Sequence, residues 1–210
     1  MRVLVCGLVL ALAAAPAGRA ATVFSDNFNA GAKADWGNEA GQWRAVKRTY
    51  DASVPGNGNP NPVTYSDVVT HPSLTDFTVK VTVKDLNDGG VWLRSAYNGG
   101  KINGVLLVTG GQLGTYNGFY WHVVQNGQFS GQLNLTPYPG AQGSTLKLKI
   151  VVKGSTYSLY VGSSKTPLST LTDTTFTSGS VGLYDYSPNS GAASPRGQVF
   201  DDFSISARHG

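Results

Sequence analysis

The chain has 210 residues, of which 27 are Gly, 13% are charged and 40% are hydrophobic. This length suits one domain, and the hydrophobic share supports a folded core, which excludes a wholly disordered chain. The glycines follow no three-residue repeat, which excludes collagen. Glu39 is the one glutamate, so few stretches have the composition of a long surface helix. The composition therefore predicts an all-β, turn-rich protein.

Residues 1–20 are predicted to be a secretory signal peptide, and residues 21–210 a single domain. Arg2 precedes an apolar run over 3–15, and Gly18-Arg19-Ala20 has the small-x-small pattern of a cleavage site. The apolar run is too short to span a bilayer. We expect a secreted or periplasmic protein, and the Ala-rich signal is typical of bacteria. A retained amphipathic anchor is the alternative.

The signal peptide changes how cysteine and charge are interpreted. Cys6 lies within it, so the mature chain has no thiol, which excludes cysteine catalysis and Cys-ligated zinc. The formal charge of +4 includes Arg2 and Arg19, whose removal leaves about +2 and no basic run. Nucleic acid is therefore not an expected partner, and neither is membrane insertion.

From Val23 onward, apolar and polar residues alternate with a period of two, which indicates half-buried strands. Turn residues separate them, and Asn126-Gly127 favours a type I′ hairpin because both residues tolerate positive φ. The expected strands cover 23–28, 41–47, 64–70, 75–85, 89–96, 103–109, 117–125, 128–135, 144–153, 156–162, 180–186 and 197–206. This number of short strands predicts a two-sheet antiparallel β-sandwich of the jelly-roll type.

Three groups of residues in chain order carry a resemblance to a known family. They are Val-Phe-Ser-Asp-Asn-Phe at 23–28, then 76–81 with Gly-Gly-Val-Trp-Leu-Arg at 89–94, then 179–184 with Val-Phe-Asp-Asp-Phe-Ser-Ile at 199–205. Together they resemble the concanavalin A-like lectin/glucanase superfamily, and within it the laminin-G-like and 3-keto-disaccharide hydrolase-like domains. The resemblance covers nearly all of 23–206. It implies two antiparallel sheets, with glycans commonly bound on the concave face or its rim. Because these motifs are mostly structural, they indicate fold more than chemistry.

Alternation along two central strands nominates a binding surface. In 89–96 and 117–125, one face carries apolar residues that read as core. The opposite face carries Trp92 and Arg94 from the first strand, and Tyr120 and His122 from the second. Aromatic rings stack on sugar rings, while Arg and His bond hydroxyls or carboxylates. We expect an exposed, carbohydrate-binding surface at these four residues.

Three tyrosines are expected at the rim of the same surface. They are Tyr97, Tyr184 and Tyr186. A third possible role is that of a structural cell-surface domain without a sugar site. Burial of Trp92 and Tyr120 would favour it.

Whether the protein is an enzyme is left open by the sequence. Retaining glycosidases need two carboxyl groups about 5 Å apart, and a single glutamate excludes the usual two-glutamate glucanase. A lyase or a 3-keto-glycoside hydrolase remains the alternative to pure binding. In that case Tyr120 and His122 would transfer protons and Arg94 would neutralise a uronate carboxylate.

The terminal strands suggest a cation. Alternation places Asp26 beside core-facing phenylalanines, and Asp201 among core-facing residues of the last strand, where a lone carboxylate is costly. The resemblance implies that the first and last strands adjoin and that a structural Ca²⁺ joins them. Asp26, Asp201 and Asp202 are the expected ligands, since Ca²⁺ prefers oxygen. The alternatives are that the aspartates cap backbone N–H groups or that a β-bulge breaks the alternation.

Overall fold

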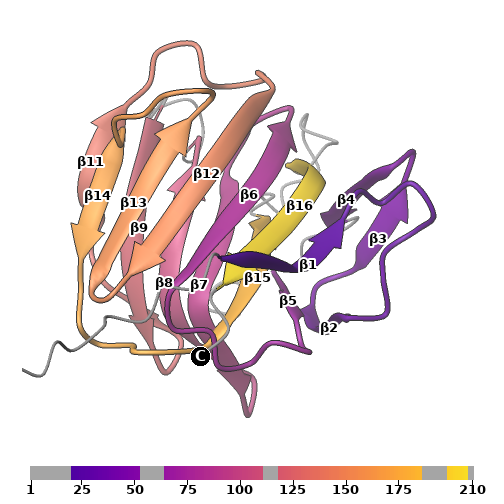
Figure 1. Cartoon of the computed structure of the whole chain (residues 1–210), viewed down its shortest axis with the longest axis horizontal. Helices are drawn as coiled ribbons and strands as arrows, with labels where there is room; N and C mark the ends of the chain where they lie inside the picture. The colour runs from indigo at the N-terminus through magenta and orange to yellow at the C-terminus, as the bar shows by residue number, and fades with distance from the viewer. Residues whose placement is uncertain (1–19, 53–63, 111–117, 186–197, 208–210) are drawn as a thin grey trace, which may run out of the picture.

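A computed structural model describes residues 20–52, 64–110, 118–185 and 198–207 of the chain. These residues form strands and turns, and no helix occurs among them. The strands build two antiparallel sheets of eight strands each, packed face to face (Figure 1). The predicted all-β sandwich of the jelly-roll type is therefore confirmed. No helix in the described residues is long and apolar enough to cross a membrane.

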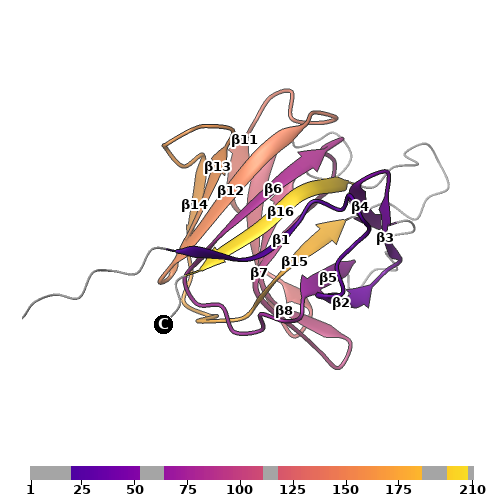
Figure 2. The same cartoon turned by 45° about the vertical axis from the view of Figure 1, so that its right-hand side comes forward.

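One sheet is built around β6 and is called the β6 sheet. Its strands are β1 (Ala21–Asp26), β3 (Trp43–Val46), β4 (Thr49–Ala52), β6 (Phe77–Lys84), β12 (Leu146–Lys153), β13 (Thr156–Val161), β14 (Ser169–Thr172) and β16 (Val199–Ala207). They are ordered β14-β13-β12-β6-β16-β4-β3. The first and last strands, β1 and β16, pair antiparallel, as the resemblance implied (Figure 2).

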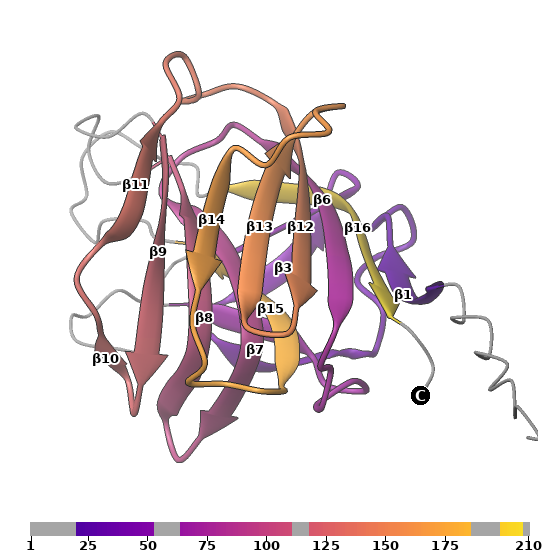
Figure 3. The ribbon, with the colours of Figure 1, turned by 60° about the vertical axis from the view of Figure 1, so that its left-hand side comes forward.

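The other sheet is built around β7 and is called the β7 sheet. Its strands are β2 (Trp36–Ala40), β5 (Tyr65–Val68), β7 (Gly89–Asn98), β8 (Lys101–Thr109), β9 (Gly118–Gln125), β10 (Gln128–Phe129), β11 (Leu133–Pro137) and β15 (Ser180–Asp185). They are ordered β10-β9-β8-β7-β15-β5-β2, with β11 paired to β9. Figure 3 shows the two sheets as separate layers.

The main core lies between the sheets, where each strand contributes alternate side chains. In β6 and β12, Val79 stands opposite Ile150 and Val81 opposite Leu148, and all four are buried. The β7 sheet contributes the residues whose sequence positions predicted a core face, namely Val91, Leu93, Phe119 and Trp121. Trp36, Trp43 and Tyr50 fill one end of this core with rings in mutual contact.

Two β-bulges interrupt the alternation at positions that matter for function. The register of β7 against β8 shifts between Leu93 and Ala96, and that of β16 against β6 shifts between Asp201 and Ser204. Arg94 and Asp202, at these two shifts, both have a φ of +47°. A bulge inserts an extra residue, so side chains near it leave the faces that strict alternation assigns to them.

Candidate functional site

An aromatic cluster lies on the face of the β7 sheet that points away from the main core. Because alternate residues of a strand point to opposite faces, the residues between the core positions meet here. We call this set the outer aromatic cluster; its buried members are Tyr65, Trp92, Ile102, Leu106, Val108, Tyr120, Val124 and Tyr184, with Tyr97 and Phe129 packed against them.

The rings of the cluster form a continuous chain of contacts across the sheet. The His122 ring centroid lies 5.3 Å from that of Tyr120 and 5.2 Å from that of Phe129. Phe129 in turn lies 6.2 Å from Trp92, and Trp92 lies 6.2 Å from Tyr65. The structure therefore brings together three of the four residues that alternation nominated, Trp92, Tyr120 and His122.

The cluster is less exposed than the sequence predicted. Trp92 is 0% exposed and Tyr120 is 6% exposed, so the expected open surface is wrong for these two rings. Their burial favours the alternative of a structural domain over a sugar site built directly on these two rings. His122, Tyr97 and Phe129 are half-buried and form the accessible edge of the cluster. Tyr97 therefore lies at the rim as expected, Tyr184 is buried within the cluster and not at its rim, and Tyr186 lies outside the described residues.

Arg94 does not share a face with Trp92, and the prediction that it does is wrong. Its guanidinium Nη2 donates to the Thr75 carbonyl at 2.6 Å and its Nη1 donates to the Phe176 carbonyl at 2.8 Å. It also lies 5.4 Å from the ring centroid of Tyr157, a core residue of the opposite sheet. The physical reason is the bulge at Arg94 in β7.

This placement also affects the enzyme alternative. A lyase of the expected kind needs Arg94 beside Tyr120 and His122 to neutralise a uronate, and the structure keeps it on the core side of the sheet. Gly179 packs so closely against the Arg94 backbone that a Cβ there would overlap it. The bulge is therefore held on both sides, by the glycine and by the carbonyl partners of the guanidinium.

His122 is held as a neutral imidazole in one orientation. Its Nδ1 lies 2.8 Å from the Ser130 carbonyl oxygen, and because a carbonyl only accepts, Nδ1–H is the donor, which leaves Nε2 as the acceptor nitrogen of the neutral ring. Burial lowers the pKa of His122 below its ordinary value, although contacts with the Ser130 and Gly131 carbonyls oppose that change. At neutral pH the ring can therefore accept a hydrogen bond through Nε2.

Two polar atoms in and beside the cluster are buried without a hydrogen-bond partner among the described residues. They are the indole Nε1–H of Trp92 and the Oδ1 oxygen of Asp67. The Tyr65 hydroxyl, whose ring contacts Trp92, donates to the other oxygen of Asp67 at 2.7 Å. Burial raises the pKa of Asp67. Sequence reasoning missed Asp67, although its two-residue spacing from Tyr65 in the expected strand 64–70 places both on one face.

A second group of buried polar residues lies at one end of the β7 sheet. Asp185 and Gln198 are 0% exposed and Asp88 is 6% exposed. Asp185 accepts the backbone N–H of Gln198 at 2.9 Å, while Asp88 Oδ1 and Asp185 Oδ2 have no partner among the described residues. Burial raises the pKa of Asp88 to about 7. Burial, with the nearby Asp51 and Asp88 carboxylates, raises the pKa of Asp185 to about 8.

The expected calcium ligands have other partners. Asp26 accepts the backbone N–H groups of Phe28 and Lys33 at 2.8 Å each, and the indole N–H of Trp36 at 3.0 Å. This is the alternative in which the aspartate caps N–H groups. Its two carboxylate oxygens thus already accept three hydrogen bonds, which accounts for a buried carboxylate without a cation.

Asp201 and Asp202 do not complete a cation site either. The bulge turns Asp201 away from the core, so its predicted core-facing position is wrong. In its actual position, Asp201 accepts a hydrogen bond from the Lys84 ammonium at 2.6 Å. Asp202 is exposed and lines a hollow that Asp26 also reaches. Among the described residues, no group of three or more Asp, Glu, His or Cys side chains is placed to hold a metal ion. These three residues do not fit Ca²⁺.

Comparisons with known proteins agree with the fold. A carbohydrate-binding module, CBM66 from Bacillus subtilis, matches with a TM-score of 0.55 and 16% identity, over 83% of this chain and 92% of that one. A Bacillus subtilis protein of unknown function with a galectin-like fold matches with a TM-score of 0.58 and 12% identity, over 90% and 98%. The luminal domain of VIP36, in a Ca²⁺- and Man3GlcNAc-bound form, matches at 0.58 and 8%, over 86% of each chain.

No family model and no curated protein matches the sequence. At these identities the structural matches establish the fold alone. The chain has the jelly-roll β-sandwich fold that the resemblance implied. Its class is therefore a two-sheet β-sandwich, and one of its structural neighbours is a carbohydrate-binding module.

Proposed function

We propose that this protein is secreted and binds a glycan against the outer aromatic cluster of the β7 sheet. One observation carries the proposal, namely that Trp92 Nε1–H and Asp67 Oδ1 are both buried without partners. Buried polar groups are hydrogen-bonded in the great majority of cases, so each exception needs an explanation. A sugar hydroxyl both donates and accepts, so it matches the hydrogen-bonding chemistry of both atoms once the rings that cover them move aside.

The half-buried edge of the cluster supplies the rest of a sugar site. His122 and Phe129 contact each other at 5.2 Å between centroids and present partly exposed rings. Such rings pack against the apolar face of a sugar, while Nε2 of His122 accepts a hydroxyl. Trp92 and Tyr120 form the floor beneath this edge. This is the arrangement of a ligand site, with mostly apolar walls and a few placed polar groups.

The structural neighbours support this class of function. One is a carbohydrate-binding module and another was solved with Man3GlcNAc bound. Their low identity means that neither identifies the glycan. The support from this chain comes from its own residues, because the aromatic cluster and the unpaired atoms lie on one sheet face.

A glycan array probed with the mature protein tests the proposal. We expect binding to a defined set of glycans, and His122→Ala should weaken it at least tenfold. His71→Ala is the matched control, because His71 lies in the turn between β5 and β6, bonded to Thr70. Folded protein that binds no glycan, or equal losses in both variants, would contradict the proposal.

A further inference from the structure

A lysine-lined hollow lies on the outer face of the β6 sheet. Alternation in β6 points Lys80 and Thr82 outward, and alternation in β12 does the same for Lys147 and Lys149. With Lys165 they line a hollow of about 450 Å³, which we call the lysine hollow. Its volume is in the range of ligand pockets. It shares no residue with the outer aromatic cluster.

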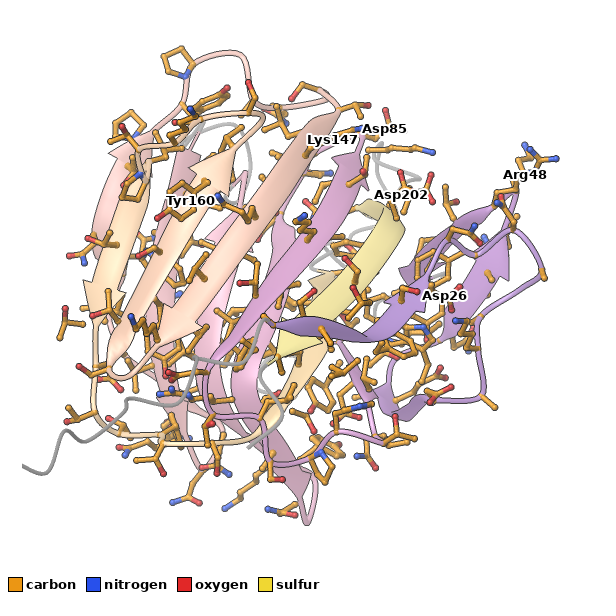
Figure 4. The ribbon with its side chains drawn as sticks, viewed as in Figure 1. Asp26, Arg48, Asp85, Lys147, Tyr160 and Asp202 are labelled. Atoms are coloured by element: carbon orange, nitrogen blue, oxygen red, sulfur yellow. The ribbon has the colours of Figure 1, made fainter. Side chains whose placement is uncertain are left out.

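The hollow carries an excess of positive charge. Four lysines and one acid, Asp202, line it, an excess of three positive charges in a chain whose formal net charge is +4. Figure 4 shows Lys147 and Asp202 toward the same end of this sheet, with Tyr160 farther across it. The printed ion pairs of the described residues join Arg44 to Asp51, Lys84 to Asp201 and Arg94 to Asp76, and Figure 4 places Asp85 near Lys147 at the edge of the hollow.

Two of these lysines oppose each other directly. Lys80 and Lys149 are cross-strand partners in the register of β6 and β12. Like charges in that position destabilise a sheet, because their Cβ atoms are about 5 Å apart. Asp202 is the one acid among four lysines in the lining of the hollow. The arrangement therefore suits a partner that brings negative charge.

Tyr160 fixes one of the ammonium groups. It is the cross-strand partner of Lys149 on β13, and Lys149 Nζ lies 3.9 Å from its ring centroid. This cation–π contact holds the ammonium over the sheet instead of leaving it free in solvent. Lys147, two residues away on the same face, is about 7 Å from Lys149 along the strand. Lys80 thus lies across the strands from Lys149, and Lys147 lies along β12 from it, so three lysines are grouped on this part of the hollow.

We propose that the lysine hollow is a second binding site, and that its ligand is an acidic polysaccharide bearing sulfate or carboxylate groups. Several ammonium groups within one hollow match a chain with repeating negative charge, and Thr82 and Ser204 in the lining supply hydroxyl groups for hydrogen bonds to sugar hydroxyls. Single-stranded nucleic acid is a poorer fit, because its binding proteins stack successive bases on several rings. Among the described residues, the lining of the hollow has no aromatic side chain, and Tyr160 adjoins it through Lys149.

The test compares two charge-matched double variants of the mature protein. Lys80→Gln with Lys149→Gln removes the opposed pair, and Lys47→Gln with Lys101→Gln removes two exposed lysines elsewhere. The probes are dextran sulfate, polygalacturonate and neutral dextran. Single-stranded DNA and phosphatidylserine vesicles are the competing anionic partners. Affinities are measured at low and physiological salt, because charge-driven binding weakens as salt rises.

We expect one or both acidic polysaccharides to bind, neutral dextran not to bind, and the Lys80/Lys149 variant to lose about tenfold in affinity. The control variant should stay within about twofold of the parent. The melting temperature of the Lys80/Lys149 variant should not fall, since a like-charge pair is removed.

Three results would overturn the proposal. They are equal losses in both double variants, no binding to either acidic polysaccharide, and DNA or vesicles binding at least as tightly as the polysaccharides. His122→Ala should leave this binding unchanged. That comparison keeps the failure of this site distinguishable from failure of the site at the outer aromatic cluster.

Discussion

Trp92 and Trp121 point from opposite faces of the β7 sheet. Of these two residues, Trp121 has a hydrogen-bond partner for its indole N–H among the described residues, and Trp92 has none. Trp121 Nε1 donates to Ser169 Oγ at 3.0 Å within the main core. Trp92 Nε1 has no partner, although both indoles are 0% exposed. Buried donors are usually satisfied in a folded protein. The proposed site therefore predicts that Trp121 serves folding and Trp92 serves binding.

Replacing each tryptophan by phenylalanine should give opposite results. Trp121→Phe breaks a hydrogen bond and leaves Ser169 without that donor, so it should lower the free energy of unfolding by about 1 kcal/mol more than Trp92→Phe. Trp92→Phe should weaken glycan binding, and Trp121→Phe should not. Urea unfolding and the glycan array measure the two effects. Binding that survives Trp92→Phe intact would remove the indole N–H from the proposed site.

Arg94 should matter for stability and not for glycan binding. Arg94→Ala leaves the Thr75 and Phe176 carbonyls without this charged donor. A hydrogen bond to a charged group contributes about 1.5–3 kcal/mol, so the free energy of unfolding should fall by about that amount or more. Lys101→Ala, at an exposed position, should change stability by less than about 0.5 kcal/mol. An Arg94→Ala variant that unfolds like the parent but loses glycan binding would show that the side chain acts at the sugar site.

Stability should fall as pH rises toward 8, because Asp88 and Asp185 are buried. Their pKa values, about 7 and about 8, lie above the ordinary 3.8. At pH values between 3.8 and the raised pKa, each of these carboxyl groups is protonated in the folded chain and ionised in the unfolded chain, so raising the pH favours unfolding. Each group contributes about 1.4 kcal/mol per pH unit within its window.

Asp185→Asn isolates one of these groups, since the amide is neutral at every pH. The variant should lose less stability than the parent between pH 5 and pH 8, as measured by urea unfolding at each pH unit. The comparison with the parent is needed because His122 changes the stability in the opposite way. Its pKa is lowered in the folded protein, so below its ordinary value of 6.5 its contribution to stability rises with pH. Parallel curves for the two proteins would mean that Asp185 is ionised in the folded state.

Asp26 should stabilise the fold through its N–H donors, without a cation. Asp26→Ala leaves three donors unpaired, including the Trp36 indole, and should lower the melting temperature strongly. Asp201→Ala, which removes a partly exposed pair with Lys84, should cost about 1 kcal/mol at most. A chelator should leave the melting temperature of the parent unchanged. A drop with chelator that Asp26→Ala abolishes would instead identify Asp26 as a calcium ligand.

The sequence predicted most of the strands because period-two alternation survives in nearly all of them. It missed β2, β4 and β14, which have five, four and four residues, too few for alternation to be distinctive. The expected strand 128–135 is divided between β10 and β11, and β2 precedes the expected strand 41–47. Glycines and hairpin turns marked most of the other boundaries correctly.

The candidate site was predicted less completely, for two physical reasons. Arg94 and Asp201 lie at bulges, where a non-glycine residue has positive φ and no sequence signal marks it. Alternation also assigns a face without saying what packs over it, so the burial of Trp92 and Tyr120 was not foreseeable. Asp185 owes its environment to Gln198 and Thr64, partners set by the fold and not by local sequence.

The most direct test of the proposed sugar site is an NMR titration of the ¹⁵N-labelled indole groups. The glycan with the strongest array signal is added to the mature protein, and Trp92→Phe and Trp121→Phe assign the two signals. The account predicts that the Trp92 Nε1–H resonance shifts and saturates with the glycan while the Trp121 resonance stays in place. Saturable binding that leaves the Trp92 indole resonance unmoved would contradict it.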